Sequence, residues 1–236
     1  MKFRLARQTD DPQIAEIIRR ELRKQDVFVP KLPAKKLADL MRLISLIEKE
    51  GIPHHLVCKK LPNKLGSGIF LSPDAKPILR NEMIAPYAGE VSIVPEYAPD
   101  DTGYAFSPLG SFKLTKDEQA HFDPKQKFHP RRLYSIKLDA EKRGNFTRFI
   151  NHSSKPNVVA CSYSIPKKNR YGLSSMPIEI IYFSKKKILP GEQLLVCYEE
   201  EEGSYWEPLG IEPFPMGPKT FSLKALKSKP VFSKNR

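Results

Sequence analysis

The sequence contains few cysteines and no long apolar stretch. Its three cysteines, Cys58, Cys161 and Cys197, are an odd number at wide spacing. They form no disulfide framework and favour a reducing compartment. No apolar run approaches the roughly 20 residues that a membrane-spanning helix needs. The first seven residues, MKFRLAR, also lack the apolar core of a secretion signal. We therefore expect a protein that works in the cytoplasm or elsewhere inside a cell, and not in a membrane.

Metal-ligating clusters are scarce as well. His54, His55 and Cys58 are close in sequence, but three ligands at this spacing are weak support for a metal site. No zinc-type cysteine cluster lies on either side of the central region, and none of the cysteines follows Cys197. We therefore predict no metal ion.

Positive charge is abundant by contrast. The 236 residues carry a formal net charge of +13, and 40% of them are hydrophobic, which is enough for a globular core. An excess of this size either has no specific partner or steers the protein to nucleic acid, anionic lipid or acidic protein surfaces. Part of it is local, since the last twenty residues hold six basic and no acidic side chains.

Two helices are predicted near the start of the chain. Apolar residues recur at helical spacing over 11–24 and again over 34–50, where Gly51 supplies a stop signal. We interpret residues 1–54 as a helical pair that packs on the main domain. A free-standing hairpin that binds a partner is the alternative.

Short strands separated by Gly and Pro dominate the rest, which predicts a mainly β domain over residues 55–210. Residues 95–130 are expected to form an irregular insert, and residues 211–236 a basic, mobile tail. The expected strands cover 55–60, 67–71, 83–88, 104–107, 132–137, 157–164, 178–183 and 194–198.

Two segments have an unusual composition. Residues 144–157, GNFTRFINHSSKPN, surround the apolar step Phe149-Ile150 with Asn, His and Ser side chains. Such side chains bond the neighbouring backbone and compete with regular helix or sheet. Residues 191–198, GEQLLVCY, form an apolar run that ends on the hydroxyl of Tyr198.

These segments resemble the signatures of the SET-domain lysine methyltransferases. Two further matches lie upstream at the expected distance, Gly66-Ser67-Gly68-Ile69-Phe70 and Tyr87-Ala88-Gly89-Glu90. The resemblance spans about residues 58–206, and the absence of zinc-binding flanks makes it closest to small bacterial, chlamydial-type members. It implies a SET fold of small sheets around a pseudoknot, and methyl transfer from S-adenosylmethionine to lysine.

The resemblance also implies roles for the matching positions. Tyr198 would be the catalytic residue that orients the acceptor amine, and Tyr104 would line the lysine channel beside it. Substrate contacts are implied for Tyr87, Glu90, Val196 and Tyr205. Cofactor contacts are implied for Gly66, Ser67, Gly68, Ile69, Arg148, Phe149, Asn151, His152 and Trp206.

The residues alone leave other interpretations open. Tyr198 could end a buried strand with its hydroxyl at the surface, and His152 could be a core histidine that satisfies backbone groups. Gly66-Ser67-Gly68 could form a plain turn, Tyr104 could serve packing only, and Tyr205-Trp206 could anchor the tail.

The implied chemistry makes one clear demand. A lysine with a pKa of about 10.4 is neutral in only about one molecule in a thousand near pH 7.4, which corresponds to roughly 4 kcal/mol. A dry aromatic channel lowers the pKa of a lysine, so a low-dielectric slot and in-line geometry suffice without a strong base. Val196-Cys197 replaces the Phe-Asp of many members, which leaves the number of methyl groups unassigned.

The expected partner is a protein with a basic, lysine-bearing segment, a histone or a histone-like protein. Glu199, Glu200, Glu201 and Glu202 could attract it or could be a solvated charge run. The charge also favours electrostatic contact with DNA, and the lysine-rich tail could be methylated itself. A non-histone substrate and an inactive binding module remain alternatives. A source in an intracellular bacterium would allow delivery to a host nucleus.

Overall fold

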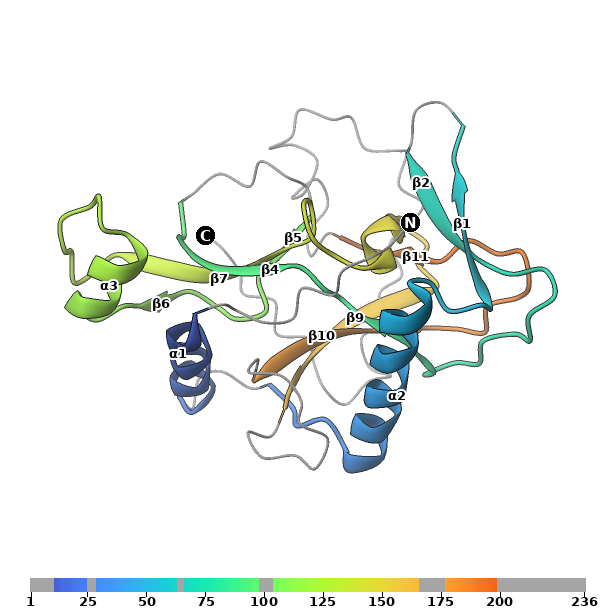
Figure 1. The fold of residues 1–236 in the computed structure, drawn as a ribbon, viewed down its shortest axis with the longest axis horizontal. Helices are drawn as coiled ribbons and strands as arrows, with labels where there is room; N and C mark the ends of the chain where they lie inside the picture. The colour runs from blue at the N-terminus through green and yellow to red at the C-terminus, as the bar shows by residue number, and fades with distance from the viewer. Residues whose placement is uncertain (1–10, 25–28, 63–65, 98–103, 166–176, 199–236) are drawn as a thin grey trace.

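The computed structural model describes residues 11–24, 29–62, 66–97, 104–165 and 177–198 (Figure 1). The predicted helices are present as α1 (Pro12–Leu22) and α2 (Ala34–Glu50). Asp11 caps α1 by accepting the Gln13 N–H at 2.9 Å. Gly51 ends α2 with a positive φ of 78°, a conformation that favours glycine.

The two helices do not pack as a pair. The buried face of α1 joins a cluster with Ile93, Phe112 and Tyr134, whereas most of the buried face of α2 joins a different cluster with Ile181 and Phe183. Figure 1 shows them against different parts of the sheets. Both helices therefore belong to the cores of the main domain, and a free-standing hairpin is wrong.

The strands form small sheets, which confirms the prediction of a mainly β domain. An antiparallel pair joins β1 (Leu56–Lys60) to β2 (Ser67–Leu71). A three-stranded sheet has the order β3 (Met83–Pro86), β10 (Ile178–Ser184), β9 (Val158–Ser164), and all its pairings are antiparallel. A parallel pair joins β8 (Asn151–His152) to β11 (Leu195–Val196).

The last sheet contains more structure than the sequence predicted. Its path runs β4 (Glu90–Pro95), β7 (Leu133–Asp139), β5 (Ala105–Phe106), and β6 (Phe112–Lys113) also pairs with β7. The helix α3 (Lys116–Phe122) follows β6 and begins with a capping box between Thr115 and Glu118. The expectation of an irregular insert over 95–130 is therefore wrong for its described part.

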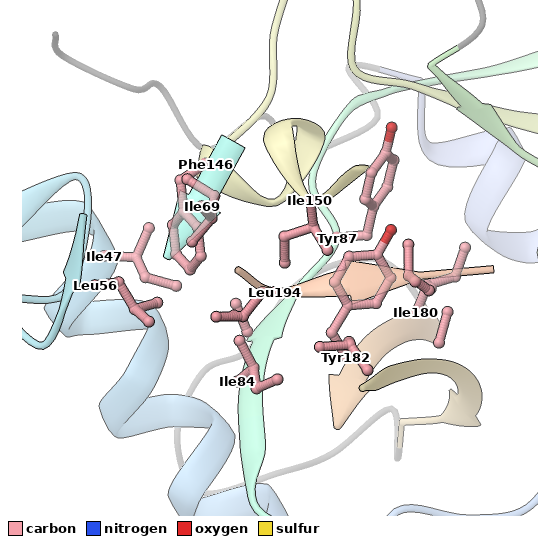
Figure 2. Packing of buried hydrophobic residues seen from close by; sticks show 14 of the residues in the cluster. Ile47, Leu56, Ile69, Ile84, Tyr87, Phe146, Ile150, Ile180, Tyr182 and Leu194 are labelled. Carbon is pink, nitrogen blue, oxygen red and sulfur yellow. The ribbon is translucent and has the colours of Figure 1, made fainter. Parts of the chain in front are cut away.

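The largest buried cluster surrounds the crossing of the two signature segments. Phe146 and Ile150 are fully buried there beside Ile69 and Leu194, which come from β2 and from the approach to β11 (Figure 2). Burying each such side chain contributes about 1.5–3 kcal/mol. The apolar residues thus hold both segments in one place. Among the described segments, no helix combines the length and apolar character that crossing a bilayer requires.

Candidate active site

The first signature segment is fixed by a buried asparagine. Asn145 is fully buried, and its Nδ2 donates to the Pro86 carbonyl at 2.8 Å. Its Oδ1 accepts the Thr147 N–H at 3.0 Å and so begins the short 3₁₀ helix η1 (Phe146–Phe149). A neutral amide that bonds backbone on both sides sets the path of the chain into Asn151 and His152.

A second buried asparagine joins the two segments. Asn157 donates from Nδ2 to the Gln193 carbonyl and accepts the Leu195 N–H at Oδ1, both at 2.8 Å. The two backbones also pair directly, since β8 runs parallel to β11 with Asn151 opposite Leu195. Residues 145–157 and 193–198 therefore form one unit, which we call the site knot.

Tyr198 lies where the site knot closes. Its N–H donates to His152 Nδ1 at 3.1 Å, and its hydroxyl donates to the Ile150 carbonyl at 2.6 Å. The side chain is half-buried and packs against the largest core cluster. A tyrosine that merely ends a strand with its hydroxyl at the surface is therefore the wrong interpretation.

The His152 side chain accepts a hydrogen bond from the backbone, which agrees with the interpretation of a histidine that satisfies backbone groups. Burial lowers the pKa of His152, so the neutral ring is favoured, and Nδ1 is then the acceptor for the Tyr198 N–H. The ring centroids of His152 and Tyr198 lie 5.6 Å apart. The imidazole thus positions Tyr198, and this role does not exclude a backbone contact with a cofactor.

Buried tyrosines surround this point. Tyr87 and Tyr182 have ring centroids 6.0 Å apart, and Figure 2 shows their hydroxyls on the same side. Burial raises the pKa of Tyr182 well above its usual range, and the neighbouring Tyr87 and Tyr198 add to the rise. Tyr182 was not predicted as a site residue, because the apolar run of β10 resembles any buried strand.

Tyr87 lies deeper than expected. It was predicted to border a substrate groove, but only 4% of it is exposed, and its ring meets Phe106 edge-on at 4.7 Å. Its hydroxyl donates to the Tyr104 carbonyl at 2.5 Å. Tyr87 therefore forms the wall behind the site, and any contact with a substrate would be made through the hydroxyl end.

Tyr104 is adjacent to the first signature segment. The Arg148 guanidinium lies 5.0 Å from the Tyr104 ring and 5.3 Å from the Phe149 ring. Tyr104 is 37% exposed, so it is not a core packing residue. Arg148 Nε is buried and has no hydrogen-bond partner among the described residues. Three predicted site residues are thus brought together, with one buried donor unsatisfied.

The glycine segment reaches the site knot through backbone. Asn151 Nδ2 donates to the Ser67 carbonyl at 2.9 Å. A Cβ on Gly68 would lie 2.6 Å from Nε2 of Gln193, which is the end of a flexible side chain, so a larger residue here would require Gln193 to move. Ser67 and Gly68 begin the strand β2, which excludes a plain turn at these two positions. Gln193 was missed by the sequence analysis.

The remaining predicted residues are placed differently. Ile69 and Val196 are almost fully buried core side chains, and the Ile69 carbonyl already accepts the Leu194 N–H at 2.8 Å. Both side chains belong to the largest core cluster. Glu90 is exposed and pairs with Arg143 at 3.2 Å. Tyr205, Trp206, the 199–202 glutamates and the 211–236 tail lie outside the described residues.

The described residues contain no group of three or more His, Cys, Asp or Glu side chains arranged to hold a metal ion. The site knot contains no carboxylate: its polar side chains are amides, hydroxyls, one imidazole, the Cys197 thiol and the cations Arg148 and Lys155.

Comparison with known proteins identifies the region that contains this site. A family model described as SET domain matches residues 68–199. The chain is 27% identical over 135 residues to a histone-lysine N-methyltransferase, H3 lysine-36 specific, of Gibberella zeae. It is 29% identical over 136 residues to histone-lysine N-methyltransferase set-2 of Caenorhabditis elegans. Each match covers 57% of this chain but only 12% and 7% of those proteins, respectively.

Solved structures share the fold. The SET domain of ATXR5 in complex with dimethylated histone H3 superimposes with a TM-score of 0.59 at 18% identity, covering 86% of this chain and 84% of that one. ATXR5 in complex with mono-methylated histone H3.1 gives a TM-score of 0.58 at 17% identity, with the same coverage. The arrangement of sheets around the site is therefore common to these chains.

Proposed function

Because this chain belongs to the SET-domain family, we propose that it is a protein-lysine N-methyltransferase that uses S-adenosylmethionine. The observation that carries the proposal is the closure of the site knot, where the Tyr198 hydroxyl bonds the Ile150 carbonyl one residue before Asn151. Both signature segments thereby meet at one tyrosine hydroxyl. The methyltransferase names of the relatives support the same reaction.

The residues present fit the cofactor. Gly68 leaves its backbone bare against Asn151 and Gln193, and Arg148 Nε is a buried donor without a partner in the described chain. These groups, with Ser67 and the His152 backbone, would hold the cofactor. When bound, S-adenosylmethionine supplies an activated methyl group on a sulfonium.

Tyr198 is proposed to orient the acceptor amine. Its hydroxyl hydrogen is engaged by the Ile150 carbonyl, so the oxygen lone pairs face the other way and can accept from an amine. Tyr87 and Tyr182 place low-dielectric surface next to it. Such surface lowers the pKa of a lysine, which reduces the roughly 4 kcal/mol needed to neutralise a free lysine near pH 7.4.

The proposed substrate is a histone or histone-like protein with a basic, lysine-bearing segment. Support comes from the relatives named for histone lysines and from the structures of ATXR5 with histone H3. Glutamates 199–202 follow Tyr198 directly in sequence and would favour a basic peptide. A non-histone substrate is the second candidate, because no described contact selects a particular peptide.

Finer properties are proposals that await experiment. The charge of +13 favours electrostatic contact with DNA, and binding that does not weaken with added salt would contradict it. A location inside a cell, or in a host nucleus for a protein of an intracellular bacterium, is also proposed. The proposed resemblance to small bacterial members rests on the absence of zinc-type cysteine clusters on either side of the matched region.

Tyr198→Phe tests the proposed function. The purified full chain is incubated with radiolabelled S-adenosylmethionine and core histones, and the proteins are separated on a gel. We expect labelled histone, and about a 100-fold lower rate for Tyr198→Phe because one positioned hydroxyl is lost. Tyr163→Phe removes the hydroxyl of another half-buried tyrosine, on β9, and serves as the control.

The outcomes separate the alternatives. Equal labelling by Tyr198→Phe and Tyr163→Phe would mean that the Tyr198 hydroxyl takes no part in the reaction. Label on the enzyme alone would keep the chemistry and point to the lysine-rich tail or to another substrate. No label on any histone, with cofactor binding intact, would favour a non-histone protein. Absence of cofactor binding would favour an inactive SET-fold binding module.

A further inference from the structure

The loop after α3 carries positive charge without compensation. Residues 124–132 contain Lys125, Lys127, Arg131 and Arg132 and no acidic residue. Arg132 pairs with Asp123 at 3.2 Å. The other three cations are exposed, and no ion pair joins them to any described residue. Three positive charges therefore face solvent on one short loop.

A buried glutamine holds this loop in place. Gln119 is 1% exposed, and its Nε2 donates to the Lys127 carbonyl at 2.9 Å while its Oε1 accepts the His129 N–H at 3.1 Å. His129 Nδ1 accepts the Arg131 N–H at 3.3 Å. The backbone between Lys127 and Arg131 is thus fixed before any ligand arrives, which reduces the entropy lost on binding.

Two exposed aromatic rings flank the cations. Phe128 is 43% exposed and lies between Lys127 and His129, and Tyr97 is 68% exposed. Tyr97 lies near Arg132, because the preceding Glu96 N–H donates to the carbonyl of Leu133, the residue after Arg132, at 3.0 Å. Single exposed aromatics are ordinary, but Phe128 lies within the run of unpaired cations, and Tyr97 lies near Arg132 at the end of the same loop.

We propose that Tyr97, Lys125, Lys127, Phe128 and Arg131, which we call the α3 surface, bind single-stranded nucleic acid. The cations would contact phosphates, and the rings would stack on unpaired bases. Duplex DNA offers the same phosphates but keeps its bases stacked, so it does not use the rings. An acidic peptide offers charge without flat bases.

The α3 surface is separate from the site knot. Figure 1 places α3 at one end of the long axis, whereas the β1–β2 pair lies near the other. The proposal therefore does not rest on the methyltransferase activity. It assigns the α3 surface to nucleic acid and leaves the site knot for a protein substrate.

The first test removes the three cations in the full-length chain. Lys125→Gln/Lys127→Gln/Arg131→Gln is compared with wild type by fluorescence anisotropy, using labelled twelve-nucleotide poly-dT and poly-rU over a salt series. The control Lys35→Gln/Lys186→Gln/Lys187→Gln removes the same charge from exposed lysines elsewhere. We expect the slope of log K against log salt to become shallower by about 2 in the test variant only.

The second test removes the rings and keeps the charge. Phe128→Ala and Tyr97→Ala should each weaken binding of the single strands about tenfold, with an unchanged salt slope and unchanged binding to heparin. Tighter binding of poly-rU would indicate that RNA is the natural ligand, and tighter binding of poly-dT would indicate single-stranded DNA. Circular dichroism and the melting temperature check that every variant is folded.

Four results would overturn the proposal. Equal loss of binding in both triple variants would mean diffuse attraction by the whole protein. Duplex DNA that competes as well as single strands, with no effect of Phe128→Ala, would mean recognition of phosphates alone. Displacement by polyglutamate at equal charge would point to an acidic protein. No binding of either oligonucleotide by wild type would also reject it.

Discussion

The site knot and the region 112–134, which we call the α3 arm, differ in how far they depend on charged side chains. In the site knot, Asn145 and Asn157 bond backbone carbonyls and N–H groups. In the α3 arm, Gln119 bonds backbone in the same way, but ion pairs also join the arm to α1 and its cap. Glu118 pairs with Arg20 of α1 at 2.6 Å, and His121 pairs with Asp11.

The difference matters for what each region can do. Neutral amides that bond backbone fix the chain path and respond little to salt, which suits a site where small displacements matter. Ion pairs at the surface attach one element to another but weaken as salt rises. The α3 arm thus attaches α1 through charge, and its remaining cations stay available to a ligand.

Removing an amide from the site knot should have the largest effect. Asn157→Ala deletes two side-chain hydrogen bonds and leaves the Gln193 carbonyl and the Leu195 N–H without them. We expect a loss of about 3 kcal/mol in the free energy of unfolding, measured by urea denaturation. Asn157→Asp keeps the acceptor but sets a buried carboxylate oxygen against the Gln193 carbonyl, so it should lose at least as much. A smaller loss for Asn157→Asp than for Asn157→Ala would contradict the assigned donor role of Nδ2.

The imidazole of His152 should contribute somewhat less to the stability of the fold than the amide of Asn157. His152→Phe removes the acceptor of the Tyr198 N–H, and we expect a loss of about 2 kcal/mol with a lower methylation rate. His152→Asn places an oxygen near the position of Nδ1 and should restore part of both. Failure of Asn to outperform Phe would mean that the ring packs and does not act as an acceptor.

The ion pair of the α3 arm should contribute less again. Glu118→Gln breaks the pair with Arg20, for which we expect a loss of about 1 kcal/mol at low salt. The loss should shrink in 1 M salt, where charges are screened within about 3 Å. Glu16→Gln breaks the more exposed pair with Arg19 and is the control. A loss for Glu118→Gln that does not depend on salt would indicate packing, not charge.

Acid should weaken the site knot before the α3 arm. Burial lowers the pKa of His152 from 6.5, so the unfolded chain binds the proton first and stability falls as pH decreases below about 6.5. For Glu118, burial raises the pKa, but hydrogen bonds from Arg20 and Thr115 lower it overall from 4.5. Its stabilisation is therefore lost only below about pH 4.5.

Urea denaturation at pH 6.5 and at pH 5.5 measures the loss of stability that the protonation of His152 causes. We expect the free energy of unfolding to decrease by less than about 1 kcal/mol between these two pH values. The decrease should be smaller in His152→Asn. Burial also lowers the pKa of His55, and this residue accounts for the part of the pH dependence that remains in His152→Asn. Burial is the main cause of the lowered pKa of His55 and the charge of His54 adds to it, so His54→Gln should slightly reduce the contribution of His55. An unchanged pH dependence in His152→Asn would assign the effect elsewhere.

Strand positions followed well from the sequence, because Gly and Pro delimit short apolar runs such as β2 and β10. The strand β4 was missed, since its half-buried residues show little alternation. The helix α3 was missed because it has only seven residues, although Thr115 and Glu118 already formed a readable capping box.

The site was predictable where motifs named it. Asn151, His152 and Tyr198 meet as expected, but the hydrogen bond from the Tyr198 N–H to His152 needed coordinates. Tyr182 and Gln193 carried no signal, because each becomes part of the site only through chain crossing. The ligand contacts predicted for Ile69 and Val196 stay predictions, and the structure adds that both side chains are buried.

The parallel pairing of β8 with β11 also bears on how the protein is made. Asn151 leaves the ribosome before Leu195, its partner in the ladder, has been joined to the chain. Domains acquire structure from the N-terminal side during synthesis, at about 5–20 residues per second. A chain whose synthesis ends before Tyr198 would therefore lack the contacts that close the site knot, even where its other sheets have formed.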